Sequence, residues 1–141
     1  MSNIDLTKLV TVADKLAAAK DARIAAISVD CQNAIFAGFH SSALGADYLY
    51  PFKVTDQRNL SDSVLASTLP GRPDDWTAPF WCADGSGEWA FRAHTAAQIQ
   101  QVGDDAMTRK LACIEQNTAL AAQVQAATDQ TEVEAVQWVD P

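Results

Sequence analysis

Basic residues are scarce in this chain. Its 141 residues include ten lysines and arginines against 18 aspartates and glutamates, and neither cation occurs after Lys110. A surface that binds DNA or RNA needs clustered lysines and arginines to displace the counterions of the phosphate backbone. The net charge of −8 therefore argues against a nucleic-acid partner. The acidity indicates either a well-solvated surface or, in a sharper interpretation, a surface that meets a basic partner.

Long apolar runs are also missing. No segment approaches the ~20 consecutive apolar residues that a membrane-spanning helix needs. Residues 1–10 have neither the basic run nor the apolar core of a secretory signal. We therefore expect no membrane partner and a protein that is made and kept in a cytoplasm-like space.

Cysteines are few, and their spacing excludes the usual cysteine motifs. Cys31, Cys82 and Cys113 are odd in number and far apart, and they lack the close pairs of a zinc site or a redox motif. Cys31 and Cys113 fall within helical patterns. We expect both to act as small buried apolar residues.

Glycine and proline are absent from residues 5–37, which predicts a long N-terminal helix. The apolar residues recur at spacings of three and four, which is typical of one helix face. The first part of this stripe contains Leu6, Leu9, Ala13 and Leu16, and after an offset it continues with Ile24, Ile27, Cys31 and Ala34. About 30 residues would span ~45 Å at 1.5 Å per residue. A break near residues 20–21 is the alternative.

The middle of the chain predicts short elements between turns. Gly38 is a plausible end of the first helix. Tyr48 and Tyr50 would share one side of a short extended segment. Residues 55–56, Thr-Asp, offer an N-cap for a short helix that carries Leu60 on its apolar face.

Residues 80–91 predict a β-hairpin. One strand runs through Phe80–Cys82, a turn follows at residues 84–87, and the second strand runs through Trp89–Phe91. Aromatic side chains bury large areas. We therefore expect this region, including Trp89, to supply the compact core.

Thr95 predicts the start of a second long helix that ends at about Ala127. Two rows along this helix are partly apolar, so it could bury two faces, as a helix in an oligomeric bundle does. One row contains Ile99, Gly103, Ala106, Lys110, Cys113, Asn117, Leu120, Val124 and Ala127, and the other contains Val102, Met107, Leu111, Ile114, Thr118 and Ala121. A short helix with a capping box at Thr131–Glu134 follows, and Trp138 is expected to anchor it.

The chain contains few groups with catalytic potential. His40 and His94 are its two histidines, and for His94 a structural role at the helix start is favoured over catalysis. The nucleophile elbow G-x-S-x-G and the phosphate loop GxxxxGK[ST] do not occur in the sequence. Residues 84–88, Asp-Gly-Ser-Gly-Glu, lack the twelve-residue pattern of a calcium loop. We therefore predict no catalytic residue, no cofactor and no metal site.

Two stretches of the sequence resemble a family of uncharacterised domains in tail proteins of tailed bacteriophages. The first has the pattern F-x-S-S-A-L-G, a tyrosine-containing extended segment and D-Q-x-N-L; the second is H-T-x-x-Q-I-Q-Q-V. The matching residues are Phe39, Ser41, Ser42, Ala43, Leu44, Gly45, Tyr50, Asp56, Gln57, Asn59, Leu60, His94, Thr95, Gln98, Ile99, Gln100, Gln101 and Val102. The resemblance covers residues 20–138.

The resemblance implies a non-enzymatic protein of the phage tail. It would be a structural component or an attachment protein of the tail fibre or baseplate, located in the virion tail after assembly in the bacterial cytoplasm. Its partners would be other tail proteins and further copies of itself. Two alternatives stay open: a tail-fibre assembly chaperone that is absent from the mature virion, and a small acidic effector that binds a host protein.

Together these patterns predict an α+β fold that is mostly α. Two long helices, as an antiparallel hairpin or in an oligomeric helical bundle, would accompany a small central β-hairpin and a short C-terminal helix. Residues 1–37 would form a docking or oligomerisation segment, and residues 38–141 a phage-tail-type domain. The candidate interaction residues are Leu6, Leu9, Leu16, Ile24, Ile27 and Trp138.

Overall fold

The computed structural model describes residues 11–141 and shows a mostly helical α+β fold. Helices hold 59% of the described residues, and the strands form one small antiparallel sheet, so the predicted class, α+β and mostly α, is confirmed. The elements are α1 (Val12–Phe36), β1 (Phe39–Ser41), β2 (Tyr48–Tyr50), α2 (Val54–Thr68), β3 (Thr77–Ala83), β4 (Trp89–Thr95), α3 (Ala96–Ala126) and α4 (Gln130–Ala135). Leu6 and Leu9 lie outside the described residues.

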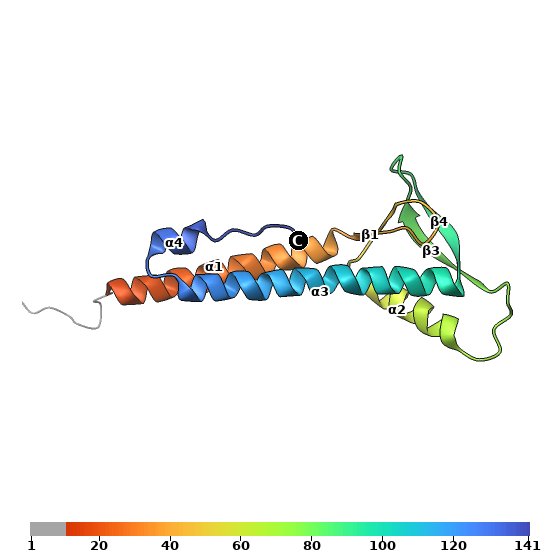
Figure 1. Cartoon of the computed structure of the whole chain (residues 1–141), viewed down its shortest axis with the longest axis horizontal. Helices are drawn as coiled ribbons and strands as arrows, with labels where there is room; N and C mark the ends of the chain where they lie inside the picture. The colour runs from red at the N-terminus through yellow and green to blue at the C-terminus, as the bar shows by residue number, and fades with distance from the viewer. Residues whose placement is uncertain (1–10) are drawn as a thin grey trace, which may run out of the picture.

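The two longest helices, α1 and α3, lie side by side and run in opposite directions (Figure 1). Lys20, early in α1, donates from Nζ to the carbonyl oxygen of Gln125, late in α3, across 2.7 Å. Further along, Cys31 Sγ lies 3.4 Å from the carbonyl oxygen of Cys113. The helix α1 continues through residues 20–21 without interruption, so the alternative of a break there is wrong.

Both ends of α1 are fixed by local chemistry. Thr11 Oγ1 accepts a hydrogen bond from the Asp14 amide, and the Asp14 carboxylate accepts one from the Thr11 amide, which satisfies two amides at the helix start. After the last turn, Gly38 has φ of 101°, a conformation that glycine adopts readily. A Cβ at Gly38 would collide with the carbonyl oxygen of Tyr50. The prediction that Gly38 ends the helix is confirmed.

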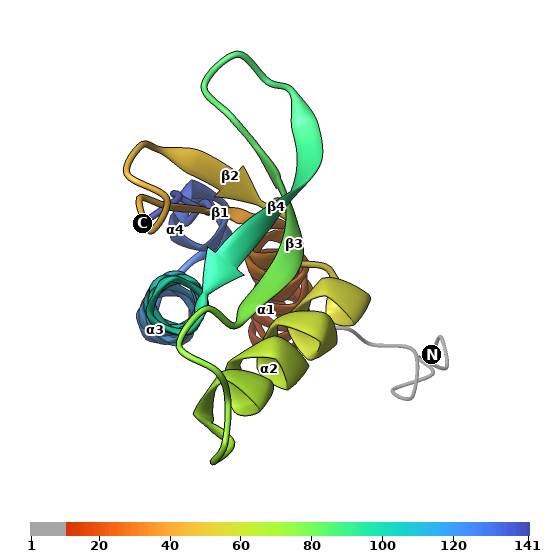
Figure 2. The same cartoon turned by 90° about the vertical axis from the view of Figure 1, so that its right-hand side faces the viewer.

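The sheet has the strand order β1-β2-β3-β4, with antiparallel neighbours. The predicted hairpin is present and longer than expected, because β3 and β4 pair over seven residues each, from Thr77↔Thr95 to Ala83↔Trp89. A single pair, Leu49↔Ala83, joins β2 to β3. His40 lies in β1. Figure 2 looks along α3 and shows the hairpin extending away from the long helices.

The core consists of two clusters that share one side chain. The larger lies between the sheet and the helices and contains Phe39, Tyr50, Phe52 and Phe80; the smaller lies between α1, the end of α3 and α4. Trp138 packs against both clusters. The buried side of α3 comprises Ile99, Val102, Ala106, Cys113, Leu120 and Val124.

The expectation that Trp89 belongs to the core is wrong. Its side chain is 39% exposed, because Trp89 lies on the outer face of the hairpin. Successive residues of a strand point to opposite faces, and the inner face of β3 is already filled by Phe80 and Cys82.

Two helix starts differ from the sequence prediction. The helix α2 begins at Val54, and Asp56 caps it from inside the first turn by accepting from the Lys53 amide at 2.9 Å. The last helix begins at Gln130 rather than Thr131, and Asp129 accepts from the Glu132 amide at 2.8 Å. Asp129 therefore takes the capping role that the sequence assigned to Thr131. By contrast, Thr95 caps α3 as predicted, and the Gln98 side chain completes the cap by accepting from the Thr95 amide.

Candidate binding groove

The outer face of the β3–β4 hairpin carries an exposed aromatic cluster. Trp81, Trp89 and Phe91 are 40%, 39% and 69% exposed. The hairpin register places Trp81 directly opposite Phe91, and their rings meet edge to face with centroids 4.9 Å apart. Trp81 also stacks on Trp89, with centroids 6.3 Å apart and an interplanar angle of 16°. The three rings support one another, so the cluster is ordered although it is exposed.

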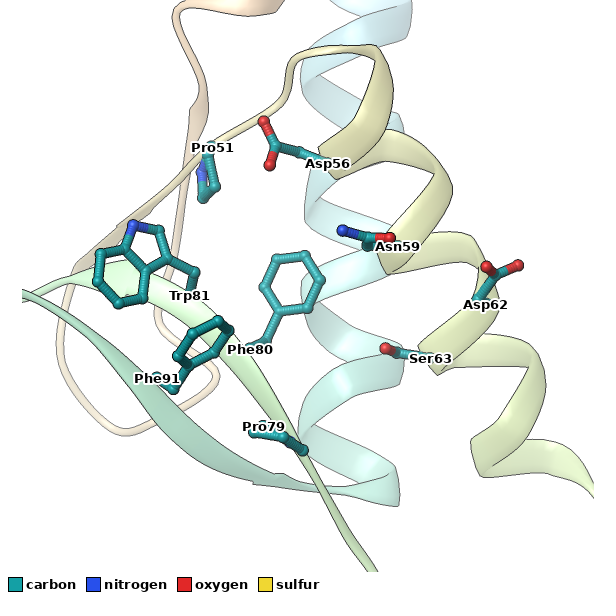
Figure 3. A pocket seen from close by; sticks show the side chains of 9 residues that line it. All are labelled: Pro51, Asp56, Asn59, Asp62, Ser63, Pro79, Phe80, Trp81 and Phe91. Carbon is teal, nitrogen blue, oxygen red and sulfur yellow. The ribbon is translucent and has the colours of Figure 1, made fainter.

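A groove of about 590 Å³ lies between this aromatic cluster and α2. Figure 3 shows the hairpin on one side and α2 on the other, with the Phe80 ring between them. Asn59 and Ser63 point from α2 toward the hairpin, whereas the carboxylate of Asp62 points away at the outer rim. The lining residues are Pro51, Asp56, Asn59, Asp62, Ser63, Pro79, Phe80, Trp81 and Phe91.

The charge of the groove is negative. Of its nine lining residues, two are aspartates and none is a lysine or arginine. Asp56 uses one carboxylate oxygen to accept from the Lys53 amide, and a carboxylate can accept further hydrogen bonds. The groove therefore combines an apolar aromatic wall with a polar wall of negative charge.

A second exposed apolar surface runs along α3. Met107, Leu111 and Ile114 are 52%, 48% and 42% exposed, and their spacings of four and three place them on one helix face. Leu65 of α2 and Met107 also line a cleft of about 580 Å³ between the two helices. From Met107 onward this outer row follows the second apolar row of the sequence, whereas Val102, the first residue of that row, is fully buried. In the described chain no element covers the outer row.

The comparison with protein families matches residues 18–137 to the domain of unknown function DUF4376. The chain belongs to this family. No curated protein and no solved structure matches the chain. Membership of DUF4376 therefore places the chain in a family without adding a chemical activity.

The histidines of this DUF4376 chain have structural partners. His94 is fully buried and lies within 2.7 Å of the Tyr50 hydroxyl and of the Arg92 carbonyl oxygen. His40 is exposed, with Nδ1 3.0 Å from one carboxylate oxygen of Asp47. Neither histidine lines the groove.

The aspartate in the turn of the hairpin also has a structural role, because it binds backbone amides of the turn. Oδ1 of Asp84 accepts from the amides of Ser86 and Glu88 and from the Ser86 hydroxyl. These hydrogen bonds lower the pKa of Asp84, and the one from the Ser86 hydroxyl contributes most. Within residues 11–141, no group of three or more histidine, cysteine, aspartate or glutamate side chains is placed to hold a metal ion. The same residues contain no helix with the length and apolarity needed to cross a membrane.

The predicted interaction residues lie apart from the groove. Leu16 and Ile24 are partly buried against the smaller core cluster, and Ile27 is fully buried in it. Trp138 is partly buried between the two clusters. These four side chains mainly hold the chain's own helices together.

The exposed surface that Trp81 and Phe91 form was not predicted from the sequence. The signal was present in the strand alternation, because an inward Phe80 and Cys82 require an outward Trp81. The antiparallel register then brings Phe91 to the same face. The wall of the groove on α2 had no such signal, because the packing of that helix beside the hairpin is a tertiary contact.

Proposed function

We propose that the chain is a non-enzymatic tail protein, a structural component or attachment protein of the tail fibre or baseplate, and that the groove docks another tail protein. The sequence resemblance to tail-protein domains supports the location. The observation that carries the docking role is the aromatic cluster of Trp81, Trp89 and Phe91, which stays exposed although the core is complete without it.

The composition of this cluster supports a docking role. Isolated apolar residues on a surface are ordinary, whereas contiguous apolar patches mark interaction sites. Tryptophan is enriched among the residues that dominate binding energy at protein interfaces, and phenylalanine is enriched in such interfaces generally. The groove therefore has the composition of a protein-docking surface, and its polar wall can orient the partner.

The long helices support a role in assembly as well. In this proposal, α1 and α3 form an antiparallel hairpin-like unit, and copies associate into a helical bundle through the outer row of α3. A row with alternating spacings of four and three is the pattern of a coiled-coil contact. The proposed partners are thus other tail proteins and further copies of the chain, with no nucleic acid and no membrane, and the final location is the virion tail.

Quantitative mass spectrometry of purified mature particles of the phage that encodes this chain tests the proposed function. A structural component should be present at a fixed stoichiometry, at a multiple of three or six copies per tail. Phe91→Asp should reduce incorporation without unfolding the protein, because Phe91 is 69% exposed. The matched control is Gln101→Asp, which introduces the same charge at an exposed position of α3 and should incorporate normally.

Absence from the particle would overturn the structural role. Abundant protein in the infected-cell lysate would then favour the chaperone, if it co-purifies with fibre proteins. Co-purification with a host protein would favour the acidic effector instead.

A further inference from the structure

We propose that the groove receives an arginine side chain from a segment of the partner protein. The guanidinium would lie against the rings of Trp81 and Phe91, and its charge would face Asp56. This inference rests on the proposed docking function and specifies the chemistry of the partner.

Three other aromatic rings of the chain each lie beneath a cation that the chain itself supplies. Arg72 lies over the Trp76 ring at 5.3 Å, and Arg92 lies over the Tyr48 ring at 5.1 Å. A third cation, Lys110, lies 6.0 Å from the centre of the Phe52 ring. These distances are within the range of cation–π attraction.

The outer hairpin cluster differs from those three rings. Within the described part of the chain, Trp81 and Phe91 have no lysine or arginine over their faces, and the groove beside them contains no cation. A cation supplied by a partner would complete an arrangement that the chain builds three times for itself.

The charge of the groove also favours a cationic partner. Asp56 and Asp62 give the groove a negative potential, and the whole chain carries a net charge of −8. Such a surface attracts a basic segment and disfavours an acidic one. A purely apolar segment would bury the polar wall formed by Asp56, Asn59 and Ser63 without satisfying it, which costs free energy.

The chemistry of the two walls of the groove favours arginine over lysine. The guanidinium is planar, stacks on aromatic rings and is more weakly hydrated than an ammonium group. It can also donate two parallel hydrogen bonds to one carboxylate. The groove offers rings on one wall, and a carboxylate, an amide and a hydroxyl on the other, which suits a flat donor with several N–H groups.

Nuclear magnetic resonance on the purified full-length chain tests the proposal. Of the four indole N–H signals, those of Trp81 and Trp89 report on the aromatic cluster, and those of Trp76 and Trp138 report on other parts of the fold. The probe is acetyl-Gly-Arg-Gly-amide, compared with the same peptide carrying lysine, glutamate or citrulline, which has the shape of arginine without its charge. We expect the arginine peptide to shift the Trp81 signal saturably, while Trp138 stays unchanged.

Two substitutions with the same change in charge sharpen the test. Asp56→Asn should weaken binding of the arginine peptide about fivefold or more, because it removes a carboxylate that would accept hydrogen bonds from the guanidinium. Asp21→Asn, at an exposed position in the first half of α1, should leave it unchanged. The start of α1 lies far from the hairpin (Figure 1). Thermal melting of both variants checks that each is folded, and Phe91→Ala provides a second variant of the groove that does not touch a helix cap.

Three results would overturn the proposal. The first is a Trp81 shift of equal size with citrulline, and the second is no shift or no effect of either groove variant. The third is a Trp81 signal that shifts with protein concentration in the absence of any peptide, which would assign the groove to a second copy of the chain. Because the assay uses purified protein, its failure leaves the particle measurement intact, and absence from the particle leaves this assay valid.

Discussion

The hydroxyl group of Tyr50 donates a hydrogen bond to Nε2 of His94 across 2.7 Å, and neither side chain has exposed surface. Nδ1 of His94 lies 2.7 Å from the carbonyl oxygen of Arg92, which can only accept, so the ring carries its proton on Nδ1. Burial lowers the pKa of His94 from its usual 6.5, and the hydrogen bond to Arg92 only partly opposes this shift. The buried pair therefore requires a neutral imidazole.

This requirement predicts that acid destabilises the fold. The unfolded chain binds a proton at His94 near pH 6.5, whereas the folded chain binds it only at a lower pH. Above about pH 6.5, His94 should therefore not affect the free energy of unfolding. Below that value the free energy of unfolding should fall by up to ~1.4 kcal/mol per pH unit, until the pH reaches the pKa of His94 in the folded chain. Urea unfolding at a series of pH values from mildly alkaline to mildly acidic measures the slope.

The two histidines of the chain provide a matched comparison. His94→Gln should remove this part of the pH dependence, and His40→Gln, at an exposed position of β1, should retain it. An identical slope in all three proteins would show that other groups cause the acid sensitivity.

The close approach of Gly103 to Val64 predicts that Gly103→Ala changes the stability in opposite directions in the wild type and in a Val64→Ala background. A Cβ at Gly103 would lie 2.8 Å from Cγ2 of Val64, and valine cannot easily rotate away because its χ1 is restricted. Gly103→Ala should therefore destabilise the wild-type protein, although alanine favours a helix interior by ~1 kcal/mol relative to glycine. In a Val64→Ala background, the same substitution should stabilise by about that amount. Urea unfolding midpoints of the four proteins test this, and stabilisation in both backgrounds would contradict it.

The sequence predicted the elements that depend on local chemistry. The glycine-free stretch ending at Gly38, the Thr95 cap of α3 and the turn between β3 and β4 each follow from residues close together in the chain. The inward row of α3 could also be read from its spacing. Helix starts shifted by one or two residues, because Asp56 and Asp129 cap from positions that the sequence pattern left ambiguous.

The groove could not be predicted in the same way. To predict its aromatic wall, one must know which face of the hairpin each strand residue occupies. To predict its polar wall, one must know where α2 packs in the tertiary structure. Trp89 was assigned to the core on size and apolarity alone, whereas the smaller Cys82 and Ala83 occupy buried positions of β3. The pairing of Tyr50 with His94 joins residues 44 positions apart and had no local signal.

The aromatic residues should divide into two classes of stability effect. Phe39 is 2% exposed and contacts Tyr50 and Phe52, so Phe39→Ala should cost ~3–5 kcal/mol of unfolding free energy. Phe91→Ala removes a ring that is 69% exposed and should cost less than ~1 kcal/mol, as exposed substitutions usually do. Chemical unfolding of both variants tests this division. A loss at Phe91 as large as that at Phe39 would place the hairpin's outer face in the core of an oligomer.

The outer row of α3 predicts self-association that single charges can prevent. Leu111 and Ile114 are 48% and 42% exposed, and burying each against a second helix would contribute on the order of 1 kcal/mol or more. Leu111→Glu and Ile114→Glu should each shift the protein to monomers in sedimentation equilibrium, because a buried unpaired carboxylate is strongly disfavoured. Their monomeric fold should be retained, since both side chains already face solvent. Gln101→Glu, an exposed position near the start of α3, is the control and should associate like the wild type. A wild-type protein that stays monomeric at millimolar concentration would exclude this row as the contact between copies.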